Sequence, residues 1–321
     1  MAKKRKRSSV APFVQHLDTP SSAKSHPDSN SKHLNLGAYH PDLDLSSFTP
    51  TQVSEYHSLL ALCLVHPSTF PPNMLKYWRH RHSLFSLYSA GCLLDEQSWY
   101  SVTPESVAFR IAKRCASDGV VVDLFAGAGG NAIQFAMTCS RVIAVELDEV
   151  KLRLARWNAS VYGVEDRITF VHGDSVELLH RLNERRSDDL KGAQNQVFWK
   201  GLTPSDLDAV QAVFLSPPWG GVDYTATDPT YSLSSIDPID GTLLFSLVHT
   251  AFATSNIAYY LPRNTSLPQL SHLATLLAGR PQPTVKVEYN YVNYGSKLSS
   301  LTAYYGALAE DWDDETDDWR S

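Results

Sequence analysis

Hydrophobic residues in the middle of the chain alternate between short continuous runs and longer stretches with a helical period. Runs of four to eight apolar residues are typical of buried strands, and apolar residues at steps of three and four predict helices. Alternation of the two patterns from residue 120 onward predicts a mostly parallel sheet with helices on both faces, a doubly wound α/β fold. The expected strands are residues 120–124, 142–146, 168–171, 210–215, 256–261, 285–291 and 300–305, with helices from about 131, over 149–162 and from about 176.

A helical pattern also precedes this alternation. From residue 48 apolar side chains recur at helical steps, and a second such pattern, residues 75–87, follows the break at Pro71-Pro72. In the segment Trp-Tyr-Ser-Val-Thr-Pro-Glu that ends this part, Thr103 resembles a helix N-cap and Pro104 a first-turn residue. We therefore expect a small helical extension, residues 48–103, that closes over the site, followed by a main domain.

Three other segments differ in composition from these two parts. Residues 1–47 are rich in Ser, Pro, His and Asp, and they predict a disordered basic and polar arm because they cannot bury enough apolar surface to offset the entropy of ordering. Within the main domain, residues 104–309, the stretch 183–208 is polar and patternless and is interpreted as a surface insertion. Residues 310–321 predict a solvated acidic tail.

Charge is distributed unevenly along the chain. The net charge is −6, although residues 3–7, Lys-Lys-Arg-Lys-Arg, are all basic. An acidic body is a poor general surface for nucleic acid, so we expect any nucleic-acid partner to be held at a small local site. The basic run predicts either a nuclear localisation patch or RNA-contacting arm, or simply a solvated start of the chain.

Several classes of protein are disfavoured. No apolar run approaches the roughly 20 residues that span a bilayer, and the chain does not begin with an apolar signal core. We therefore expect neither membrane insertion nor secretion. The four cysteines are scattered without paired spacing, so neither a metal site nor a disulfide framework is expected.

A glycine-rich turn follows the first expected strand. In Asp-Leu-Phe-Ala-Gly-Ala-Gly-Gly-Asn, Gly127 and Gly129 allow a tight turn and close approach of a ligand, and the helix that begins near Asn131 offers free N–H groups. Dinucleotide, nucleotide and sulfonium cofactors are all bound by such turns. The turn alone therefore predicts a cofactor site without identifying the cofactor.

Acidic residues at the ends of three successive strands limit which cofactor the site can bind. Glu146, about 20 residues after the turn, can accept the ribose hydroxyls of a nucleoside, and Asp174 follows the third strand, placed for an adenine amino group. Asp123 precedes the glycines, where it would repel a pyrophosphate but attract a sulfonium or ammonium. S-adenosylmethionine is favoured over NAD. Taken singly, Asp123 could instead fix a loop or cap a helix, and Glu146 could be an exposed charge.

A stiff corner, Ser216-Pro-Pro-Trp219, follows the fourth expected strand at the edge where doubly wound folds bind ligands. The prolines restrict the backbone, so the Ser216 hydroxyl and the Pro217 carbonyl form two fixed acceptors suited to an exocyclic NH₂ group. Trp219 offers a face on which a base can stack. The corner therefore predicts methylation of a base amine, unless Trp219 merely fills the core below the strand.

These motifs together resemble the trimethylguanosine synthase family, which methylates the exocyclic N2 of the 7-methylguanosine cap of small nuclear and nucleolar RNAs. The resemblance runs from about Lys76 to Gly306 and rests on the segments Lys-Tyr-Trp, Trp-Tyr-Ser-Val-Thr-Pro-Glu, Ser-Pro-Pro-Trp-Gly-Gly, Leu-Pro-Arg-Asn and Thr-Ala-Tyr-Tyr-Gly. It implies a class I, Rossmann-like methyltransferase fold. Glu146 departs from the family pattern, in which an Asp is familiar.

The resemblance also implies roles for individual residues. Trp219 would stack on the methylated guanine while Ser216 and Pro217 hold its amine. A second group would contact the cap and its phosphates, and a third would surround S-adenosylmethionine. The cap group comprises Lys76, Asn158, Tyr224, Arg263 and Asn264, and the cofactor group comprises Phe85, Thr103, Asp123, Gly127, Gly129, Asn131, Glu146 and Asp174. Lys76 and Arg263 could equally be ordinary surface cations.

The sequence therefore predicts an S-adenosylmethionine-dependent methyltransferase that forms the 2,2,7-trimethylguanosine cap without a metal or a covalent intermediate. Two alternatives stay open: an amino-methyltransferase that acts on an internal base of ribosomal RNA or DNA, and an inert cap-binding or RNP-assembly protein. The expected partners are 7-methylguanosine-capped small nuclear and nucleolar RNAs, and proteins of their RNP cores. The expected location is the nucleus and nucleolus, with some cytoplasmic presence.

Overall fold

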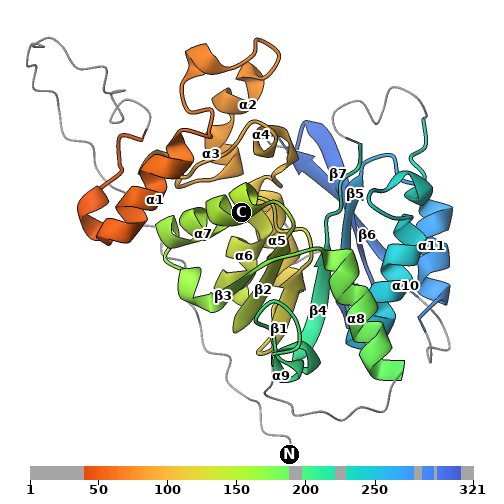
Figure 1. The fold of residues 1–321 in the computed structure, drawn as a ribbon. Coiled ribbons are helices and arrows are strands. Elements are labelled where there is room, and N and C mark those ends of the chain that lie inside the picture. The colour runs from red at the N-terminus through yellow and green to blue at the C-terminus, as the bar shows by residue number, and fades with distance from the viewer. Residues whose placement is uncertain (1–39, 188–196, 221–228, 278–283, 293–294, 312–321) are drawn as a thin grey trace, which may run out of the picture. The chain divides into compact units, whose positions relative to one another are not determined.

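A seven-stranded sheet forms the centre of the protein (Figure 1). The computed structural model describes residues 40–187, 197–220, 229–277, 284–292 and 295–311, all within one compact unit from Leu36 to Ser321. All seven predicted strands are present, within three residues of the expected bounds. The strands are β1 (Val120–Asp123), β2 (Arg141–Glu146), β3 (Ile168–His172), β4 (Val210–Leu215), β5 (Ile257–Pro262), β6 (Lys286–Val292) and β7 (Lys297–Tyr304).

The strand order is β3-β2-β1-β4-β5-β7-β6. β1 to β5 pair in parallel, whereas β7 pairs antiparallel with both β5 and β6. Because the order reverses direction between β1 and β4, the carboxyl ends of these two strands flank the crevice where doubly wound sheets bind ligands. The sheet is therefore mostly parallel, as predicted, with an antiparallel edge.

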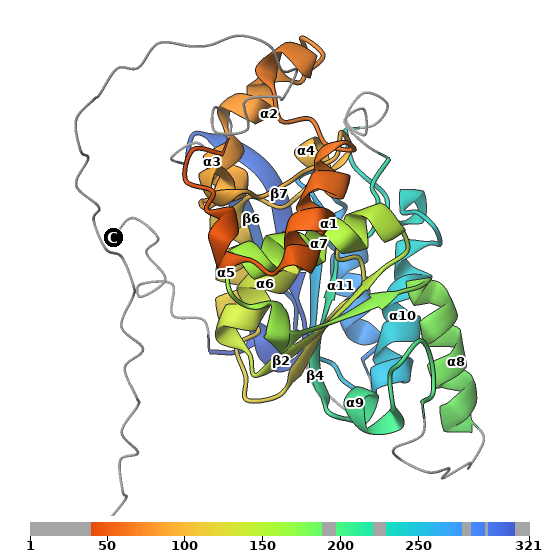
Figure 2. The same cartoon turned by 60° about the vertical axis from the view of Figure 1, so that its left-hand side comes forward.

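Helices cover both faces of the sheet (Figures 1 and 2). Adjacent strand residues face opposite sides, so Val121 packs with α5, α6 and α7 while Val122 packs with α8, α10 and α11. Each face has its own hydrophobic cluster, which explains why the central strands are apolar throughout. The helices are α1 (Pro50–Leu60), α2 (Leu75–Arg79), α3 (Arg81–Leu84), α4 (Ser98–Ser101), α5 (Glu105–Arg114), α6 (Gly130–Thr138), α7 (Glu149–Val161), α8 (Ser175–Ser187), α9 (Pro204–Asp208), α10 (Gly241–Phe252) and α11 (Leu267–Thr275).

The N-terminal extension consists of α1 to α4, which lie on the side of α5 and α7 (Figure 2). α1 packs against α7, and Glu55 accepts two hydrogen bonds from Arg153 at 2.7 and 3.0 Å. The prediction of one continuous helix over residues 75–87 is wrong. The segment divides into α2 and α3, because the chain bends at His80, which lies between them.

Residues 40–47, at the end of the predicted arm, are folded. Within residues 40–47, His40 is 2% exposed, and its Nδ1 lies 2.9 Å from the hydroxyl of Tyr56. Burial lowers the pKa of His40 to about 4, so the ring is neutral and packs edge-on against Tyr88. Residues 40–47 therefore belong to the folded unit, whereas residues 1–39 lie outside the described part of the chain.

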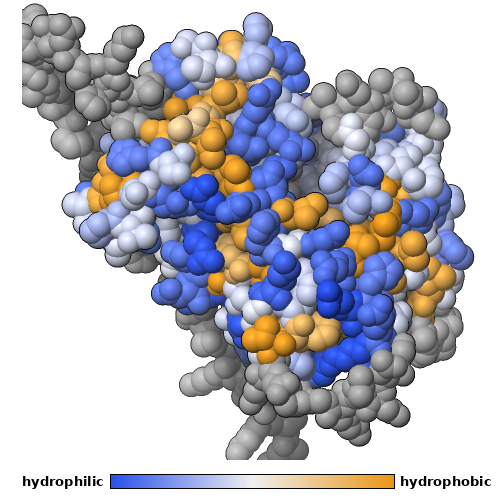
Figure 3. Space-filling view, in the orientation of Figure 1, coloured by the Kyte–Doolittle hydropathy of each residue, from blue (hydrophilic) through white to orange (hydrophobic). Residues whose placement is uncertain are grey.

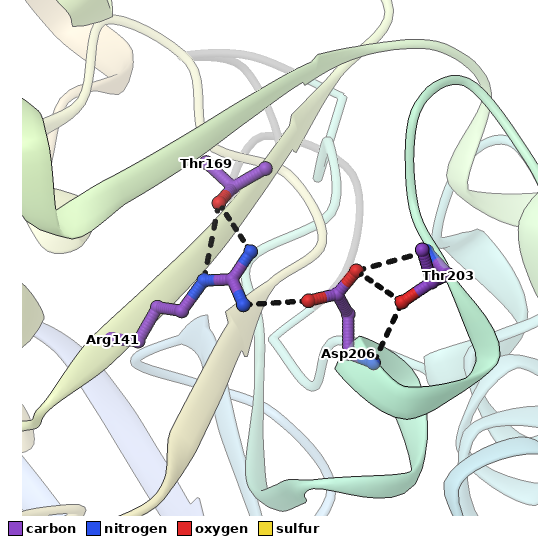
Figure 4. Close-up of polar contacts among 4 residues, drawn as sticks. All are labelled: Arg141, Thr169, Thr203 and Asp206. Atoms are coloured by element: carbon purple, nitrogen blue, oxygen red, sulfur yellow. Dashed lines mark hydrogen bonds and ion pairs between the residues drawn. The ribbon is translucent and has the colours of Figure 1, made fainter. Parts of the chain in front are cut away.

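The predicted insertion, residues 183–208, is also more integrated than expected. α8 continues to Ser187 and α9 forms at Pro204, and Trp199 and Leu207 are buried in the core. At the amino ends of β2 and β3, Arg141 donates to Asp206 at 2.6 Å and to Thr169 at 3.0 Å (Figure 4). α9 is therefore fastened to the sheet, on the edge away from the predicted site; residues 188–196 lie outside the description.

The surface of the main domain differs in hydropathy from that of the N-terminal extension. Hydrophilic residues cover α8, whereas hydrophobic residues reach the surface around α1 and α3 (Figure 3). Leu62 and Leu87, in the segments after these two helices, are 49% and 41% exposed. A search of the described residues finds no helix long and apolar enough to cross a bilayer.

Candidate functional site

Four of the predicted site residues meet at the carboxyl edge of the sheet. Asp123 is the last residue of β1, Glu146 the last of β2, and Asp174 lies two residues after β3. Ser216 directly follows β4, the strand that pairs with β1 on the other side. Parallel strands bring these side chains to one edge although they come from distant parts of the sequence.

The glycine turn between β1 and α6 is fixed by Glu146. One carboxylate oxygen of Glu146 accepts from the Gly127 N–H at 2.7 Å, and the other accepts from the Asp148 N–H at 2.9 Å. Gly127 and Gly129 have φ values of +52° and +91°, a region that favours glycine. The backbone thus holds the Glu146 carboxylate in place, and each oxygen keeps a lone pair for ribose hydroxyls.

Asp123 is fully buried beside this turn. Its Oδ1 accepts from the Phe125 N–H at 3.3 Å, whereas its Oδ2 has no hydrogen-bond partner among the described residues. Burial raises the pKa of Asp123 to about 7; the Phe125 N–H opposes this shift and the charge of Glu146 adds to it. A buried carboxylate oxygen without a partner is costly, so the position is suited to a cationic ligand.

Asn131 and Thr103 lie together at the start of α6. The Asn131 Nδ2 donates to the Thr103 hydroxyl at 2.9 Å, while the buried Asn131 Oδ1 is a second acceptor without a partner in the described chain. The prediction that Thr103 is the N-cap of α5 is wrong. Pro104 occupies the N-cap position, and the Thr103 hydroxyl accepts from Asn131 instead. Two orphaned acceptors and an open glycine turn fit S-adenosylmethionine, which carries an ammonium and a sulfonium.

Asp174 is held in the turn that opens α8. Its Oδ1 accepts from the Val176 N–H at 2.8 Å. The preceding Gly173 lies so close to Trp199 that a Cβ there would overlap the indole ring, and the Trp199 Nε1 donates to Glu177 at 3.2 Å. Trp199, from the predicted insertion, therefore packs behind the predicted adenine position. Sequence analysis missed this role, because no local motif joins Trp199 to Gly173.

The proline corner after β4 is fixed from several sides. The Ser216 hydroxyl donates to the Phe125 carbonyl at 3.3 Å, which leaves its lone pairs to accept, and Pro217 is buried. The Pro218 carbonyl accepts from the Asp237 N–H at 3.2 Å. The Trp219 indole is partly buried, with its centroid 5.0 Å from that of Tyr260 on β5 and the planes inclined at 44°.

Phe125 joins the two halves of the site through its backbone. Its N–H donates to Asp123 and its carbonyl accepts from Ser216. The buried carboxylate and the predicted amine acceptor are therefore separated by one residue and two hydrogen bonds. Sequence analysis did not single out Phe125, because a backbone bridge leaves no trace in residue type.

The predicted cap-binding residues are distributed less tightly. Lys76, on α2, lies with its Nζ 5.0 Å from the Tyr77 ring centroid. Arg263 is exposed just after β5 and donates to the Leu298 carbonyl at 3.3 Å, and Asn264 donates to the Pro229 carbonyl at 3.2 Å. Tyr224 lies outside the described residues.

The structure gives Asn158 a different role from the predicted phosphate contact. Its side chain is fully buried in α7. The amide accepts from the Leu93 N–H at 2.8 Å and donates to the carbonyls of Leu93 and Ala128, each at 3.0 Å. A phosphate cannot reach this side chain in the present conformation, so Asn158 instead joins the extension to the glycine turn.

Phe85 is 1% exposed and lies in a clamp that attaches the extension to the core. The carboxylate of Glu105 accepts from the Ser86 N–H, from the Ser86 hydroxyl at 2.8 Å and from the Tyr162 hydroxyl at 2.8 Å. The Phe85 ring centroid lies 6.1 Å from that of Tyr162. The clamp positions Phe85; its predicted contact with the cofactor stays a prediction.

The arrangement is one of hydrogen-bond acceptors and aromatic faces. A search of the described residues for three or more clustered His, Cys, Asp or Glu side chains finds no such group. A buried carboxylate, a glycine turn and a rigid pair of oxygen acceptors beside an indole can hold a cationic methyl donor and a base amine in one crevice.

Comparison with solved structures supports the fold. The chain is similar to a crystal structure assigned as a methyltransferase, from Porphyromonas gingivalis, with a TM-score of 0.52 and 12% sequence identity. The match covers 81% of this chain and 59% of that one. At this identity the likeness concerns the fold alone, and it agrees with the predicted class I methyltransferase architecture.

Comparison with known sequences identifies the family. The chain is similar to the trimethylguanosine synthase of Schizosaccharomyces pombe, 37% identical over 66% of this chain and 80% of that protein. It is also similar to the trimethylguanosine synthase of Saccharomyces cerevisiae, 30% identical over 73% of this chain and 67% of that protein. A family model matches residues 118–308, which include the glycine turn, the three acids and the proline corner. The chain belongs to the RNA cap guanine-N2 methyltransferase family.

Proposed function

We propose that this protein is a trimethylguanosine synthase. It transfers methyl groups from S-adenosylmethionine to the exocyclic N2 of a 7-methylguanosine RNA cap and forms the 2,2,7-trimethylguanosine cap. The similarity to two trimethylguanosine synthases and the family match over residues 118–308 support this activity. S-adenosylmethionine is the cofactor, and RNA is the substrate.

The observation that carries the proposal is the proline corner with Trp219 at the end of β4. The Ser216 hydroxyl is held by the Phe125 carbonyl, the Pro218 carbonyl is held by the Asp237 N–H, and Trp219 packs beside Tyr260 on the adjacent strand. A 7-methylguanine is cationic, and a cation gains about 0.5–2 kcal/mol over an aromatic face in addition to about 1–3 kcal/mol from stacking. The corner is thus better suited to a cap guanine than to an uncharged base.

The chain's own residues act mainly by orientation. Bound S-adenosylmethionine supplies an electrophilic methyl group. Asp123 faces positive charge with its free oxygen, and Glu146 and the glycine turn hold a nucleoside. The Ser216 hydroxyl and the Pro217 carbonyl accept hydrogen bonds from the amine protons and direct the nitrogen lone pair, which is otherwise shared with the ring.

Proton removal needs no dedicated base in this scheme. An amine gains acidity as it becomes alkylated, so its proton passes to water or to a weak acceptor such as Ser216. We propose no covalent enzyme intermediate. Lys76, Arg263 and Asn264, which lie on α2 and in the segment after β5, would contact the cap and its phosphates, together with Tyr224.

The RNA substrates that we propose are small nuclear and nucleolar RNAs, with RNP core proteins as further partners. The basic run at residues 3–7 supports a nuclear and nucleolar location, with some cytoplasmic presence. These assignments can be tested by sequencing RNA recovered with a trimethylguanosine antibody from cells that lack the protein. Unchanged trimethylation of these RNAs would contradict them.

Mass spectrometry of two cap dinucleotides tests the activity itself. The 7-methylguanosine form and its unmethylated twin are incubated separately with the protein and S-adenosylmethionine. We expect a gain of two methyl groups, 28 mass units, on the first substrate and none on the second. A gain on both substrates would contradict the inference that the site selects the cationic 7-methylguanine. A gain on neither would favour an internal-base methyltransferase or an inert cap-binding protein.

A further inference from the structure

The edge strand β6 reaches the same side of the sheet as the candidate site. β5 and β6 both pair antiparallel with β7, so they run in the same direction. The carboxyl end of β6 therefore lies at the edge where β4 and β5 end. β6 is the last strand in the sheet order, and one side of its backbone has no strand neighbour among the described residues.

The two faces of β6 differ in how their side chains are used. Glu288 and Asn290 face α5, where Arg110 donates to them at 2.7 and 3.3 Å. Tyr289 and Tyr291, which alternate with them, face the opposite side and are 43% and 46% exposed. Two half-exposed aromatic side chains, two residues apart on one face, form a surface of the kind on which bases stack.

Arg263 connects these tyrosines to the proposed cap site at the carboxyl edge of the sheet. Tyr260, beside which Trp219 packs, shares its register row with Thr302 and Glu288, so its side chain lies on the α5 face, opposite the two tyrosines. Three residues later, after the end of β5, Arg263 donates to the Leu298 carbonyl at 3.3 Å. Leu298 is the register partner of Tyr291. Because hydrogen-bonded strands lie about 4.8 Å apart, β6 lies about 10 Å from β5 across β7. An RNA that leaves the cap site would therefore pass Arg263 and turn around the carboxyl edge of the sheet to reach the two tyrosines.

We propose that Arg263, Tyr289, Tyr291 and Lys297, here called the tyrosine edge, bind the nucleotides that follow the cap. Lys297 is exposed at the start of β7, where it pairs with Val292. Single-stranded RNA requires aromatic faces for its bases and cations for its phosphates, and the tyrosine edge provides both. This inference rests on the proposed function and adds to it the recognition of the RNA body.

An added protein strand is the other occupant that an exposed edge can accept. Strand addition uses the backbone of β6, and it requires neither the exposed phenol rings nor the Arg263 guanidinium. Arg263, a predicted contact of the cap phosphates beside β7, and the second exposed cation, Lys297, favour RNA. Because the rest of the protein is acidic, it repels RNA phosphates in general. The local basic and aromatic surface should therefore bind mainly RNA that is already held by its cap.

The test compares two ligands and two variants of the full chain. The ligands are a 7-methylguanosine cap dinucleotide and a capped single-stranded RNA of about ten nucleotides with a fluorophore at its 3′ end. The first variant is Tyr289→Ala with Tyr291→Ala. The matched control is Phe109→Ala, because Phe109 is 44% exposed on α5, which packs on the other face of the sheet. Binding is measured by fluorescence anisotropy, with the dinucleotide as competitor.

We expect the wild type to bind the capped RNA about 10-fold more tightly than the dinucleotide. The double tyrosine variant should lose that difference and still bind the dinucleotide as the wild type does, and Phe109→Ala should change neither Kd. A double variant that binds capped RNA normally overturns the tyrosine edge, and so does an equal loss for both ligands, which would indicate a structural defect. Because binding is measured without turnover, failure of the methylation test on the dinucleotide would be a separate result.

Discussion

The acidic part of the site, at the ends of β1 to β3, differs from the proline corner after β4 in how its side chains are held. In the acidic part, the carboxylates of Asp123, Glu146 and Asp174 each accept a backbone N–H at 2.7 to 3.3 Å. In the proline corner Trp219 is half-buried, and Arg263, which follows the next strand, is exposed. The first region is positioned by backbone hydrogen bonds, whereas the second presents large side chains that are more exposed.

This difference indicates an order of events. A site fixed by backbone hydrogen bonds loses little entropy when its ligand arrives, whereas exposed side chains must be ordered at the moment of binding. We therefore expect S-adenosylmethionine to bind without RNA, and the cap site to become ordered by its ligand. Variants in the two regions should separate cofactor binding from cap binding.

Loss of the indole should have the largest effect. Stacking and the cation–π interaction together contribute about 1.5–5 kcal/mol, so Trp219→Ala should lower kcat/KM for the cap roughly 10- to 5000-fold. The Kd for S-adenosylmethionine, measured by calorimetry, should stay within about 2-fold of wild type. Trp219→Phe keeps an aromatic face and should lose less, and Ser216→Ala should slow turnover only moderately. If Ser216→Ala were the more severe variant, orientation of the amine would outweigh stacking.

Asp123 should govern the pH dependence of cofactor binding. Its pKa is about 7 in the cofactor-free protein, so it is largely protonated at pH 6 and ionised at pH 8. A cationic ligand prefers the ionised form, and the affinity for S-adenosylmethionine should rise with pH up to about 7 and then level off. Asp123→Asn should weaken binding about 10- to 100-fold and remove this pH dependence. Retention of the pH profile in the variant would assign it to another group.

The same shift has an opposite effect on stability. The folded protein binds a proton at Asp123 between pH 4 and 7 that the unfolded chain has already released. The contribution of Asp123 to the free energy of unfolding is therefore most favourable below pH 4, and it falls as the pH rises to 7. Asp123→Asn should raise the Tm of the cofactor-free protein at pH 8 while it weakens cofactor binding. A lower Tm would show that the carboxylate supports the fold.

The acidic part of the site was more predictable from the sequence than the cap part. Valine-rich strands, a glycine turn and an acid at each strand end are local signals, and the order of parallel strands brings them together. Asn158 failed as a prediction because position in a helix does not reveal which way an amide points. In the structure it faces inward, where its hydrogen bonds to Leu93 and Ala128 leave it no surface.

Other features could not be predicted because they join distant segments. Phe125 bridges the halves of the site through backbone atoms, and Trp199 reaches Gly173 from a stretch that has no periodic pattern. α10 and α11 were not expected. α10 is apolar over much of its surface, so it lacks a clear amphipathic stripe, and its start is marked mainly by Asp240, which accepts from the Thr242 and Leu243 N–H groups.

Gly127 and Gly129 allow the effect of a steric clash to be separated from the effect of backbone strain. Both have positive φ, which costs an alanine about 1–2 kcal/mol. A Cβ on Gly127 meets nothing within 4 Å, whereas a Cβ on Gly129 lies 3.0 Å from the Ala155 Cα on α7. Gly129→Ala should therefore lower the free energy of unfolding by about 1 kcal/mol more than Gly127→Ala, measured with urea. Gly127→Ala should lose cofactor affinity instead, since its methyl group projects into open space at the turn. Equal loss of stability would indicate that strain dominates at both positions.

The smallest effect should come from the clamp between the extension and the core. Tyr162→Phe removes the hydrogen bond that the hydroxyl donates to Glu105 and the one that it accepts from the Leu87 N–H, and it keeps the ring beside Phe85. It should cost about 0.5–1.5 kcal/mol in stability for each bond lost. If the clamp positions both the cofactor side and the cap side, through Phe85 and through Lys76 on α2, the KM values for S-adenosylmethionine and for the cap should rise together, each about 2- to 5-fold. Ser101→Ala, in the same extension but hydrogen-bonded only to the Gln97 carbonyl among the contacts described, is the control and should leave both unchanged. A rise in one KM alone would show that the extension positions only the cofactor side or only the cap side. The sheet alone would then account for the expected order of binding, in which S-adenosylmethionine binds before the cap.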